Sequence, residues 1–513
     1  MESFGEPGYG MACTLRAINR KLRVVSWKEK CKLLLKLLLR PFGVKRNLFL
    51  GGYYLEEDEA QQEQDEQIYL KWKSEEVAKL PGTHQTVTRR EAVATNEERQ
   101  QTSCISTIKD LLKERDSYLA LAVQKLDRGG LEEVVRWLAM EMQKQGIPLK
   151  IFCIESGGEI AEDLRKAGIE VLLFDGRRER LEEYCRAHRP WLVNSHYVLD
   201  FLEVFRQFSI PVVEVIHNMY VFLDEAGMEL ERQKRLSINR YIAVSGRAKE
   251  VFCHKFPDVE EDRITVIGNA LRGKRQIHRS REQVRETLGI SQDAYVYLTV
   301  GSVDARKNQL GILRGWDIFR KLVQEPVALV VAGGGTDYEY EYKIKAFLAD
   351  RELQDSVFFI GHSNEVEELL HASDVFVLDS YYEGWSMAAT EALGCGVPII
   401  HSDCGSGAEL TAGGSCGILI DNPLAQIEAY DRMVLYNKMH AGVNENMEQF
   451  VAALLEMHKQ REYWRGQREA IRAYAERNFA GETALERYLE VFLKAQNDKE
   501  RSKTNEQSRN RNY

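Results

Sequence analysis

The stretch YLALAVQKLDRGGLEEVVRWLAMEMQKQGIPLKIFCI, residues 118–154, carries the strongest indication of the fold. Residues 118–123 form an apolar run that is typical of a buried parallel strand, and residues 149–154 form a second one. Between them, Gly129 and Gly130 turn the chain, and residues 131–145 have the apolar spacing of a helix. The stretch therefore predicts one strand–helix–strand unit with parallel strands.

Short apolar runs recur along the chain in two series, and each run is followed by a polar or small residue. The first series comprises residues 118–123, 149–154, 170–174, 191–195, 212–216, 241–244 and 264–267. The second series comprises residues 295–300, 328–332, 357–360, 375–378, 397–400 and 417–420. Two consecutive α/β domains, each with a doubly wound parallel sheet, are the simplest architecture. Ligands of such sheets bind beyond the carboxyl ends of the strands, so the residues that follow each strand are the first candidates for a site.

Length and composition exclude several classes of protein. The 513 residues correspond to roughly three domains of about 150 residues each. With 44% hydrophobic and 29% charged residues, the chain is neither wholly disordered, nor collagen-like, nor a polytopic membrane protein. A net charge of -9 argues against a protein built mainly to coat nucleic acid.

The cysteines indicate a reducing compartment. There are nine of them, without a CxxC pair and without histidines at zinc-finger spacing. We therefore expect reduced thiols, no structural metal site and a cytoplasmic protein.

The front end of the chain is unusual in its charge. Residues 16–46 contain eleven Lys or Arg and one acid, Glu29, with basic residues at every fourth position from Lys28 to Arg40 and leucines between them. This pattern predicts a basic amphipathic helix on an anionic membrane surface, and it fits equally well a helix docked on the protein's own core. Residues 56–66, with seven acids and no base, and the polar residues 83–102 are predicted to be solvated linkers or exposed helix.

Polar residues follow the predicted strands of the first series. Gly129 and Gly130 lead into a helix, where backbone N–H groups can approach an anion, although a glycine pair is also common in tight turns. Further polar residues after later strands are expected to line one rim of the site: His196, His217, Asn218, Ser245 and Asn269. A histidine at such a position is more often a structural hydrogen-bonding group than a catalyst.

The second series begins with a strand followed by GSVDARKNQ, residues 301–309. The paired cations Arg306 and Lys307, on a turn that begins at Gly301, suit a diphosphate, because arginine offers a bidentate fork and lysine a point charge. A solvated basic loop is the alternative. Glycines 333–335 follow the next strand and give a second place where backbone can approach a ligand closely.

The stretch DSYYEGWSMAATEALGCGVPII, residues 379–400, is the most informative for function. Glu383 lies in a loop after a strand, Ser386 is the predicted N-cap of a short helix over residues 387–393, and Glu391 lies within that helix. Free N–H groups at a helix N-terminus bind phosphate or sugar oxygens, and a carboxylate accepts hydrogen bonds from sugar hydroxyls. An acidic capping arrangement without a ligand would have the same spacing.

These motifs together resemble the retaining glycosyltransferases of family 4. The resemblance rests on Glu383 and Glu391 at the spacing Glu-x7-Glu, on residues 301–309, on AVSGRAKE at 243–250, on VIGNALR at 266–272 and on the glycines at 129–130. It covers residues 116 to 495 and implies the GT-B fold, in which two Rossmann-like domains face a cleft. The implied reaction is transfer of a sugar from a nucleotide-diphosphate sugar to a glycan or lipid-linked saccharide, with retention of the anomeric configuration.

The resemblance also implies a role for each matching residue. Arg306 and Lys307 hold the donor diphosphate, and no metal or other cofactor is required. Glu391 binds the ribose and Glu383 lies beside the donor sugar, while His217 approaches the donor sugar and the acceptor hydroxyl. Backbone groups complete the implied site: Gly129, Gly130, Gly301, Gly384, Trp385, Ser386 and Met387. Base contacts are expected near residues 361–364.

The resemblance divides the chain into five segments. We expect an N-terminal extension of unknown fold (1–115), an acceptor domain (116–278), a nucleotide-sugar domain (279–465), closing helices that cross to the first domain (466–495) and a disordered polar tail (496–513). Ser302 stands where many relatives have arginine, so the expected second cation is absent unless Arg306 supplies it. Two other functions are compatible with this fold: a nucleotide-sugar epimerase, and a catalytically silent module that binds a partner. The expected location is the cytoplasm, peripherally on the membrane face through residues 16–46.

Overall fold

A computed structural model describes residues 61, 63–73, 103–273, 277–335 and 337–510, with side chains as far as residue 501. The predicted basic amphipathic segment, residues 16–46, and the polar run 83–102 lie outside the described residues. Among the helices that are described, none combines the length and the apolar character that a membrane span requires. All cysteines within the described ranges are free thiols.

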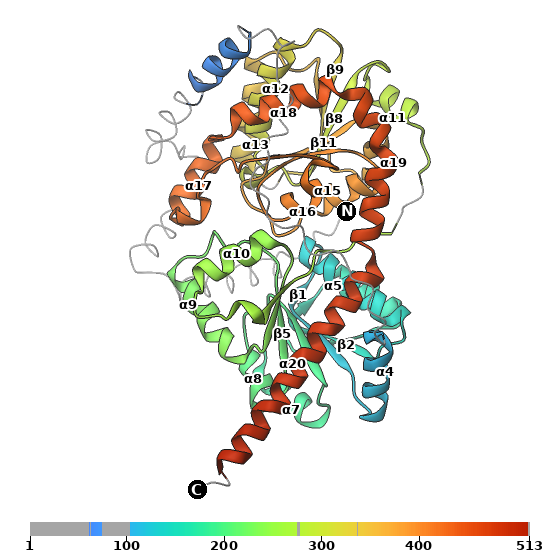
Figure 1. Cartoon of the computed structure of the whole chain (residues 1–513), viewed down its shortest axis with the longest axis vertical. Helices are drawn as coiled ribbons and strands as arrows, with labels where there is room; N and C mark the ends of the chain where they lie inside the picture. Colours follow the sequence, from blue (N-terminus) through green and yellow to red (C-terminus); the bar gives the residue numbers. More distant parts are fainter. Residues whose placement is uncertain (1–60, 62, 74–102, 274–276, 336, 511–513) are drawn as a thin grey trace, which may run out of the picture.

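The chain folds into two lobes, each built on one parallel sheet (Figure 1). The sheet of the first lobe has the strand order β3-β2-β1-β4-β5-β6-β7, and the sheet of the second lobe has the order β10-β9-β8-β11-β12-β13. When the strands of each lobe are numbered from one, both sheets have the order 3-2-1-4-5 over their first five positions, which is the order of a Rossmann sheet. The predicted fold, two Rossmann-like domains after an N-terminal extension, is therefore confirmed.

The first lobe alternates strands and helices along the chain. Its strands are β1 Leu119–Leu126, β2 Leu149–Gly157, β3 Glu170–Leu173, β4 Leu192–His196, β5 Val212–Ile216, β6 Arg240–Ala243 and β7 Ile264–Val266. Its helices are α4 Cys104–Glu114, α5 Gly130–Lys144, α6 Glu159–Lys166, α7 Arg178–Ala187, α8 Leu202–Gln207, α9 Glu225–Lys234 and α10 Gly246–Lys255. Every residue of β4 and β5 is buried, because helices cover both faces of the sheet.

The second lobe repeats this organisation. Its strands are β8 Tyr295–Val300, β9 Val327–Ala332, β10 Val357–Gly361, β11 Val375–Leu378, β12 Ile399–Ser402 and β13 Gly417–Ile420. Its helices are α11 Arg281–Leu288, α12 Gln309–Leu322, α13 Tyr338–Asp350, α14 Val366–Ala372, α15 Met387–Gly394, α16 Gly407–Thr411, α17 Arg432–Ala441 and α18 Met447–Lys459. The register of β8 on β9 is unbroken from Tyr295↔Val327 to Val300↔Ala332, so both strands end at the edge that faces the first lobe's site residues.

The chain returns to the first lobe through two helices, α19 Arg461–Asn478 and α20 Gly481–Asn510 (Figure 1). The sequence analysis expects closing helices over residues 466–495. The break between the two helices lies at Phe479, whose ring lies 5.4 Å from that of Trp385 and whose carbonyl accepts a 2.7 Å hydrogen bond from Leu271 N–H. The interruption therefore lies where the chain crosses between the lobes.

The end of α20 also differs from the sequence-based expectation of a disordered tail from residue 496. The helix continues to Asn510, and its last described side chains contact the first lobe. Arg240 donates to the Asp498 carboxylate at 2.6 Å, Gln496 donates to the carbonyl of Trp191, and Lys499 donates to the carbonyl of Ser209. These contacts hold residues 496–499 against the first lobe.

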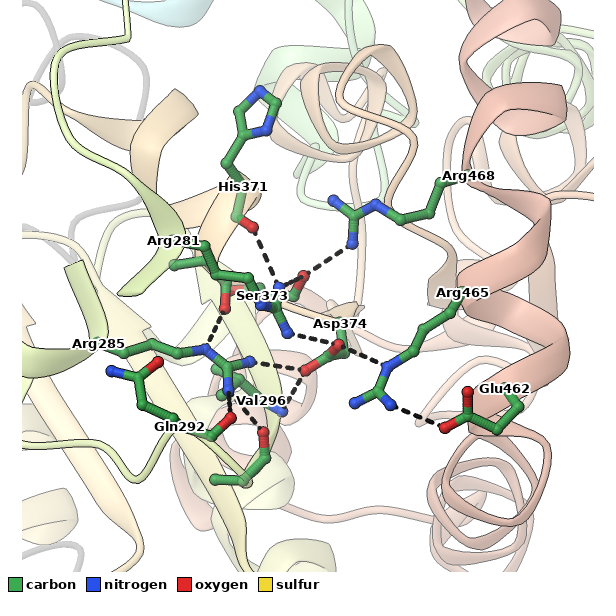
Figure 2. A network of polar contacts seen from close by, with 12 residues as sticks. Arg281, Arg285, Gln292, Val296, His371, Ser373, Asp374, Glu462, Arg465 and Arg468 are labelled. Carbon is green, nitrogen blue, oxygen red and sulfur yellow. Dashed lines mark hydrogen bonds and ion pairs between the residues drawn. The ribbon is translucent and has the colours of Figure 1, made fainter. Parts of the chain in front are cut away.

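A buried aspartate fixes α19 on the second lobe (Figure 2). The carboxylate of Asp374, just before β11, accepts hydrogen bonds from Arg281 at 2.7 Å and Arg285 at 2.9 Å, and Arg465 of α19 approaches it to 3.5 Å. Arg468 of α19 donates to the carbonyl of Ser373 at 3.0 Å. The network thus joins α11, the end of α14 and the crossing helix into one unit.

Candidate functional site

A cavity of about 980 Å³ lies between the two lobes. All the predicted site residues except Gly129 line it: Gly130, His217, Gly301, Arg306, Lys307, Glu383, Gly384, Trp385, Ser386, Met387 and Glu391. His217 and Gly301 come directly after strands, and the others lie in the segments that follow β1, β8 and β11, at the carboxyl ends where ligands of such sheets bind. The structure therefore brings together residues that are far apart in the sequence, although their individual roles stay predictions.

The two predicted cations converge on one carboxylate. Arg306 and Lys307 belong to a 3-10 turn, Ala305–Lys307, whose N-cap is Asp304. Lys307 Nζ lies 2.5 Å from Glu383 Oε1, and Arg306 Nη1 lies 3.2 Å from the same oxygen. Arg306 and Lys307 therefore place two adjacent positive charges in the cavity wall, and the role of Arg306 as the second cation stays a prediction.

The electrostatics of Glu383 follow from this contact. Burial alone raises the pKa of Glu383, but the charges of Lys307 and Arg306 outweigh burial and lower the pKa to about 2. Glu383 is therefore ionised at neutral pH, and its carboxylate can accept hydrogen bonds but cannot donate one.

This pKa makes a prediction for acid stability. Because the folded pKa lies below the ordinary value of 4.5, ionised Glu383 stabilises the fold above that pH, and the stabilisation is lost as the pH falls towards 2. We expect the unfolding free energy of Glu383→Gln to fall less steeply below pH 4.5 than that of the wild type, by up to about 1.4 kcal/mol per pH unit. Urea unfolding of both proteins from about pH 5 to about pH 3 measures the slopes. Equal slopes would contradict the contact with the two cations.

The segment after Glu383 is shaped by local capping. Ser386 Oγ accepts a hydrogen bond from Ala389 N–H, as predicted for the N-cap of α15. The backbone N–H of Ser386 donates to Ser406 Oγ at 3.0 Å, so this N–H group is already used, which differs from its expected role toward a ligand. The indole N–H of Trp385 donates to Thr390 at 2.8 Å, which holds the ring against the helix.

The backbone of Gly384 touches the first lobe. A Cβ atom at this position would lie 1.7 Å from the carbonyl oxygen of His217, so only glycine fits. Gly384 lies in the loop after β11 and His217 directly follows β5, so loops of the two lobes meet at this contact. The contact brings the loop of Glu383 against the histidine that was predicted to approach the donor sugar.

The tautomer of His217 follows from a chain of hydrogen bonds. Asn194 Nδ2 donates to the carbonyl of Val213 at 3.0 Å, which leaves Asn194 Oδ1 as the acceptor for His196 Nε2–H at 2.9 Å. His196 Nδ1 then accepts from His217 Nε2–H at 2.9 Å. Burial lowers the pKa of His217 to about 3, so its imidazole is neutral and its Nδ1 is an acceptor. A neutral imidazole in this state can accept a hydrogen bond from a hydroxyl group.

The remaining predicted rim residues separate into two groups. Asn218 and Asn269 line the cavity, as does the turn at His362 where base contacts were expected. His196 instead lies behind His217, and Ser245 caps α10 by accepting a hydrogen bond from Ala248 N–H. Gly129 is the extended N-cap of α5, and Gly130 is the residue of that pair that reaches the cavity.

Sequence reasoning missed an arginine at the site. Arg272 lines the cavity, and its Nη1 lies 3.3 Å from Glu391 Oε1. The residue is the last of the motif VIGNALR, so its position was available from the sequence, but its partner lies more than a hundred residues away. A ligand that binds Glu391 therefore meets a carboxylate that is already paired.

A group of aromatic side chains was also missed. Tyr197, Tyr220 and Phe222 line the first-lobe side of the cavity, with neighbouring ring centroids 6.1 to 6.2 Å apart. Phe222 also lies 6.0 Å from Tyr382 of the second lobe. Tyr197 directly follows β4, which was the one signal in the sequence for this group. The cavity therefore has an aromatic wall on its first-lobe side, which reaches Tyr382 beside Arg306.

Ion pairs connect the lobes at the rim. Arg247 at the start of α10 lies 3.1 Å from Glu428 of the second lobe, and Arg432 of α17 lies 2.8 Å from Asp224, the N-cap of α9. Both pairs join side chains of opposite charge across the interface. They support the arrangement in which Gly384 contacts His217.

One group of side chains within the described ranges has ligand atoms close enough for a metal ion: Glu367, His371 and Cys395, whose ligand atoms lie within 4.8 Å of one another. Arg468 donates to the carbonyl of Cys395 at 3.5 Å. The pKa of His371 is lowered mainly by burial and further by the positive charge of Arg468. A neighbouring guanidinium opposes the binding of a cation. The group is therefore poorly suited to a metal, although its side chains have the right types.

Comparisons with known proteins agree with this geometry. The profile of the family described as "Glycosyltransferase Family 4" matches residues 128–272, and that of "Glycosyl transferases group 1" matches residues 280–450. The two matches meet near the boundary between the lobes, and together they span more than half of the chain.

Individual relatives are distant. A D-inositol 3-phosphate glycosyltransferase from Paenarthrobacter aurescens is 24% identical over 334 residues, which cover 58% of this chain and 81% of the relative. A UDP-Gal:alpha-D-GlcNAc-diphosphoundecaprenol alpha-1,3-galactosyltransferase from Escherichia coli is 29% identical over 171 residues, 32% of this chain and 42% of the relative.

Among solved structures, Anabaena HepE in complex with UDP superposes with a TM-score of 0.59 at 15% identity, covering 74% of this chain and all of HepE. At this identity the likeness shows the fold alone. Taken with the two family profiles and with a cleft lined by the family's motif residues, it shows that the chain belongs to glycosyltransferase family 4 and is a glycosyltransferase of the GT-B fold.

Proposed function

We propose that the cleft transfers a sugar from a nucleoside diphosphate sugar to a hydroxyl of a glycan or lipid-linked saccharide, with retention of the anomeric configuration. The observation that carries this proposal is the pair Arg306 and Lys307 beside Glu383, at the carboxyl ends of β8 and β11. Two adjacent cations in a largely buried wall suit a diphosphate, and their charges stabilise the negative charge that develops on the departing nucleotide.

The proposed reaction needs few groups from the protein. The acceptor oxygen forms a bond to the anomeric carbon while the bond from that carbon to the phosphate oxygen breaks, and its electron pair leaves with the nucleoside diphosphate. The acceptor's proton passes to the leaving phosphate on the same face, so no separate general base is required. Ionised Glu383 and neutral His217 orient sugar hydroxyls as acceptors of hydrogen bonds. No step requires a metal.

The names of similar proteins and structures suggest which substrates to test first. The name of the Escherichia coli relative includes a UDP-galactose donor and a diphosphoundecaprenol-linked acceptor, and the HepE structure contains UDP. We propose UDP-sugars as the first donors to test and a lipid-linked saccharide as the first acceptor. The wall formed by Tyr197, Tyr220 and Phe222 suits the apolar face of an acceptor sugar ring. A lipid-linked acceptor also fits the proposed peripheral position on the cytoplasmic membrane face, through residues 16–46.

A transfer assay tests this function. The full-length protein is incubated with radiolabelled UDP-sugars and a diphosphoundecaprenol-linked monosaccharide, and the product's anomeric coupling is read by NMR. The proposal expects an α-linked product from an α-linked donor. A β-linked product would contradict retention, and conversion of the donor into its epimer without transfer would favour the epimerase.

Glu391 provides a separate test of the donor site. Replacing Glu391 with alanine removes the proposed hydrogen bonds to the ribose, so we expect nucleotide binding to weaken by about 1 to 3 kcal/mol. Isothermal titration calorimetry with UDP measures the change. Glu367→Ala is the matched control, because Glu367 lines the same cavity without a predicted contact to the ribose. An unchanged affinity in Glu391→Ala would remove this residue from the donor site.

A further inference from the structure

A helix of the N-terminal extension packs on the second lobe. Residue 61 and residues 63–73 are helical, and this helix lies beside α12 and α18 (blue, Figure 1). Ile68 and Trp72, four residues apart, are 7% and 5% exposed. Lys71 forms an ion pair with Glu448 of α18. The helix, termed here the extension helix, is therefore attached through a buried apolar face. The sequence predicted a solvated linker or exposed helix over residues 56–66; the described residues 61 and 63–66 are helical, with residues 63, 64 and 66 exposed and Gln61 buried.

The extension helix also places polar groups inside the lobe. Gln61 is only 4% exposed, and its Oε1 accepts a 3.0 Å hydrogen bond from the backbone N–H of Asn444. Asp65 lies 3.5 Å from Arg314 of α12, a side chain that is 2% exposed. Burial raises the pKa of Asp65, and the charge of Arg314 opposes that shift. These are contacts to groups that water does not reach.

Asn444 belongs to a buried network around Asp379. Its Nδ2 donates to Asp379 at 2.7 Å, Asn308 Nδ2 donates to Asp379 at 3.0 Å and to Asn444 Oδ1 at 2.8 Å, and Asn446 donates to Asp379 at 2.9 Å. All four side chains are buried. The contact from Gln61 therefore ends on a fully buried set of hydrogen bonds.

This network lies directly behind the cations of the cleft. Asn308 follows Lys307, has φ 55° and caps α12, so its side chain determines how the cation turn enters that helix. Asp379 begins the loop that leads to Glu383, and Tyr381 N–H in that loop donates to the carbonyl of Arg306 at 3.0 Å. One carboxylate thus holds both the turn that carries Lys307 and the loop that carries Glu383.

We propose that the extension helix is a positioning element of the glycosyltransferase site, which holds the cation turn in place through Asn444 and Asp379. The matches to the family profiles begin at residue 128, so this element lies outside the matched domains. This proposal depends on the proposed function in one respect: that function identifies the ligand of the site as a nucleoside diphosphate. The link from Gln61 to Lys307 is a matter of structure and can be tested without a nucleotide.

Hydrogen–deuterium exchange on the full-length protein tests the link. Gln61→Leu removes the acceptor for Asn444 N–H, and Gln67→Leu makes the same chemical change on the exposed face of the same helix. We expect Gln61→Leu to speed exchange of amides in peptides covering residues 301–310 and 379–386, and Gln67→Leu to leave them unchanged. Peptides of β1 and β2, in the other lobe, report whether the whole fold is retained.

A second variant and a second measurement complete the test. Asp65→Asn removes the charge opposite Arg314 and is expected to speed exchange at the start of α12, even if Gln61→Leu fails to fold. In calorimetry, Gln61→Leu is expected to weaken UDP binding about fivefold, the equivalent of one net hydrogen bond. Unchanged exchange at residues 301–310 in both variants would overturn the proposal. Wild-type protein that does not bind UDP would count against the proposed function, and the exchange result would still decide the role of the extension helix.

Discussion

Replacing Lys307 with methionine is expected to lower kcat by about 100- to 1000-fold, because one of the two charges that stabilise the departing diphosphate is lost. Lys307 Nζ lies 2.5 Å from Glu383 Oε1, so the variant also leaves a buried carboxylate with Arg306 as its remaining cation. Steady-state kinetics with the donor that the transfer assay identifies measures the effect.

The control for this variant is Lys345→Met, at an exposed lysine on α13. We expect its kcat to equal that of the wild type. Arg306→Met should be measured in parallel, since both cations contact the same oxygen of Glu383 and the structure assigns them similar positions. A Lys307→Met enzyme with wild-type kcat would contradict the proposed contact with the diphosphate.

Replacing Gly384 with alanine is expected to force the lobes apart. The added Cβ would lie 1.7 Å from the carbonyl oxygen of His217, a backbone atom that cannot move without moving β5. Because a displacement of about 1 Å in a reacting group can cost about 100-fold in rate, we expect at least that loss in kcat/KM. Small-angle X-ray scattering should show a larger radius of gyration.

Gly466→Ala is the matched control for the alanine substitution. A Cβ at Gly466 meets nothing within 4 Å, and alanine is favoured in a helix such as α19. We expect this variant to keep the wild-type scattering profile and kcat/KM. Gly384→Ala with a wild-type rate and scattering profile would mean that the contact between Gly384 and His217 is dispensable.

The fold was predictable because central strands of both sheets, such as β5 and β11, are buried on both faces. Strands β5, β8, β11 and β13 begin and end at the predicted residues, and each is a short apolar run that no helix periodicity obscures. The strand β12, Ile399–Ser402, begins two residues later than expected. Pro398 lies between the two boundaries, and it lacks the N–H group that a ladder requires.

The site was predictable only in part, for a different reason. Gly301 and His217 follow strands directly, so the rule that ligands bind at strand ends placed them correctly in the cavity. The rule does not predict which side chains contact each other across the cavity. The ion pair of Arg272 with Glu391 joins residues distant in the sequence, and only the tertiary structure reveals it.

Contacts between distant parts of the sequence were also not predictable for the N-terminal extension. The acidic residues around Asp65 indicated a solvated linker or exposed helix, and the helix forms with several of them exposed. The contact of Asp65 with buried Arg314 was not predictable, because Arg314 belongs to another part of the chain. The apolar pair Ile68 and Trp72 was too short a pattern to predict docking. Composition alone therefore could not predict that this polar helix docks on the second lobe, where Arg314 supplies the charge opposite Asp65.

The most direct test of the central claim is a thermal-shift measurement on the full-length protein with UDP, GDP, ADP and CMP. A ligand at about 100 times its Kd stabilises the fold by about 2.7 kcal/mol. The account predicts that one nucleoside diphosphate raises the melting temperature of the wild type and raises that of Lys307→Met less. A wild-type protein whose melting temperature responds to none of these nucleotides would contradict a nucleotide-sugar site in this cleft.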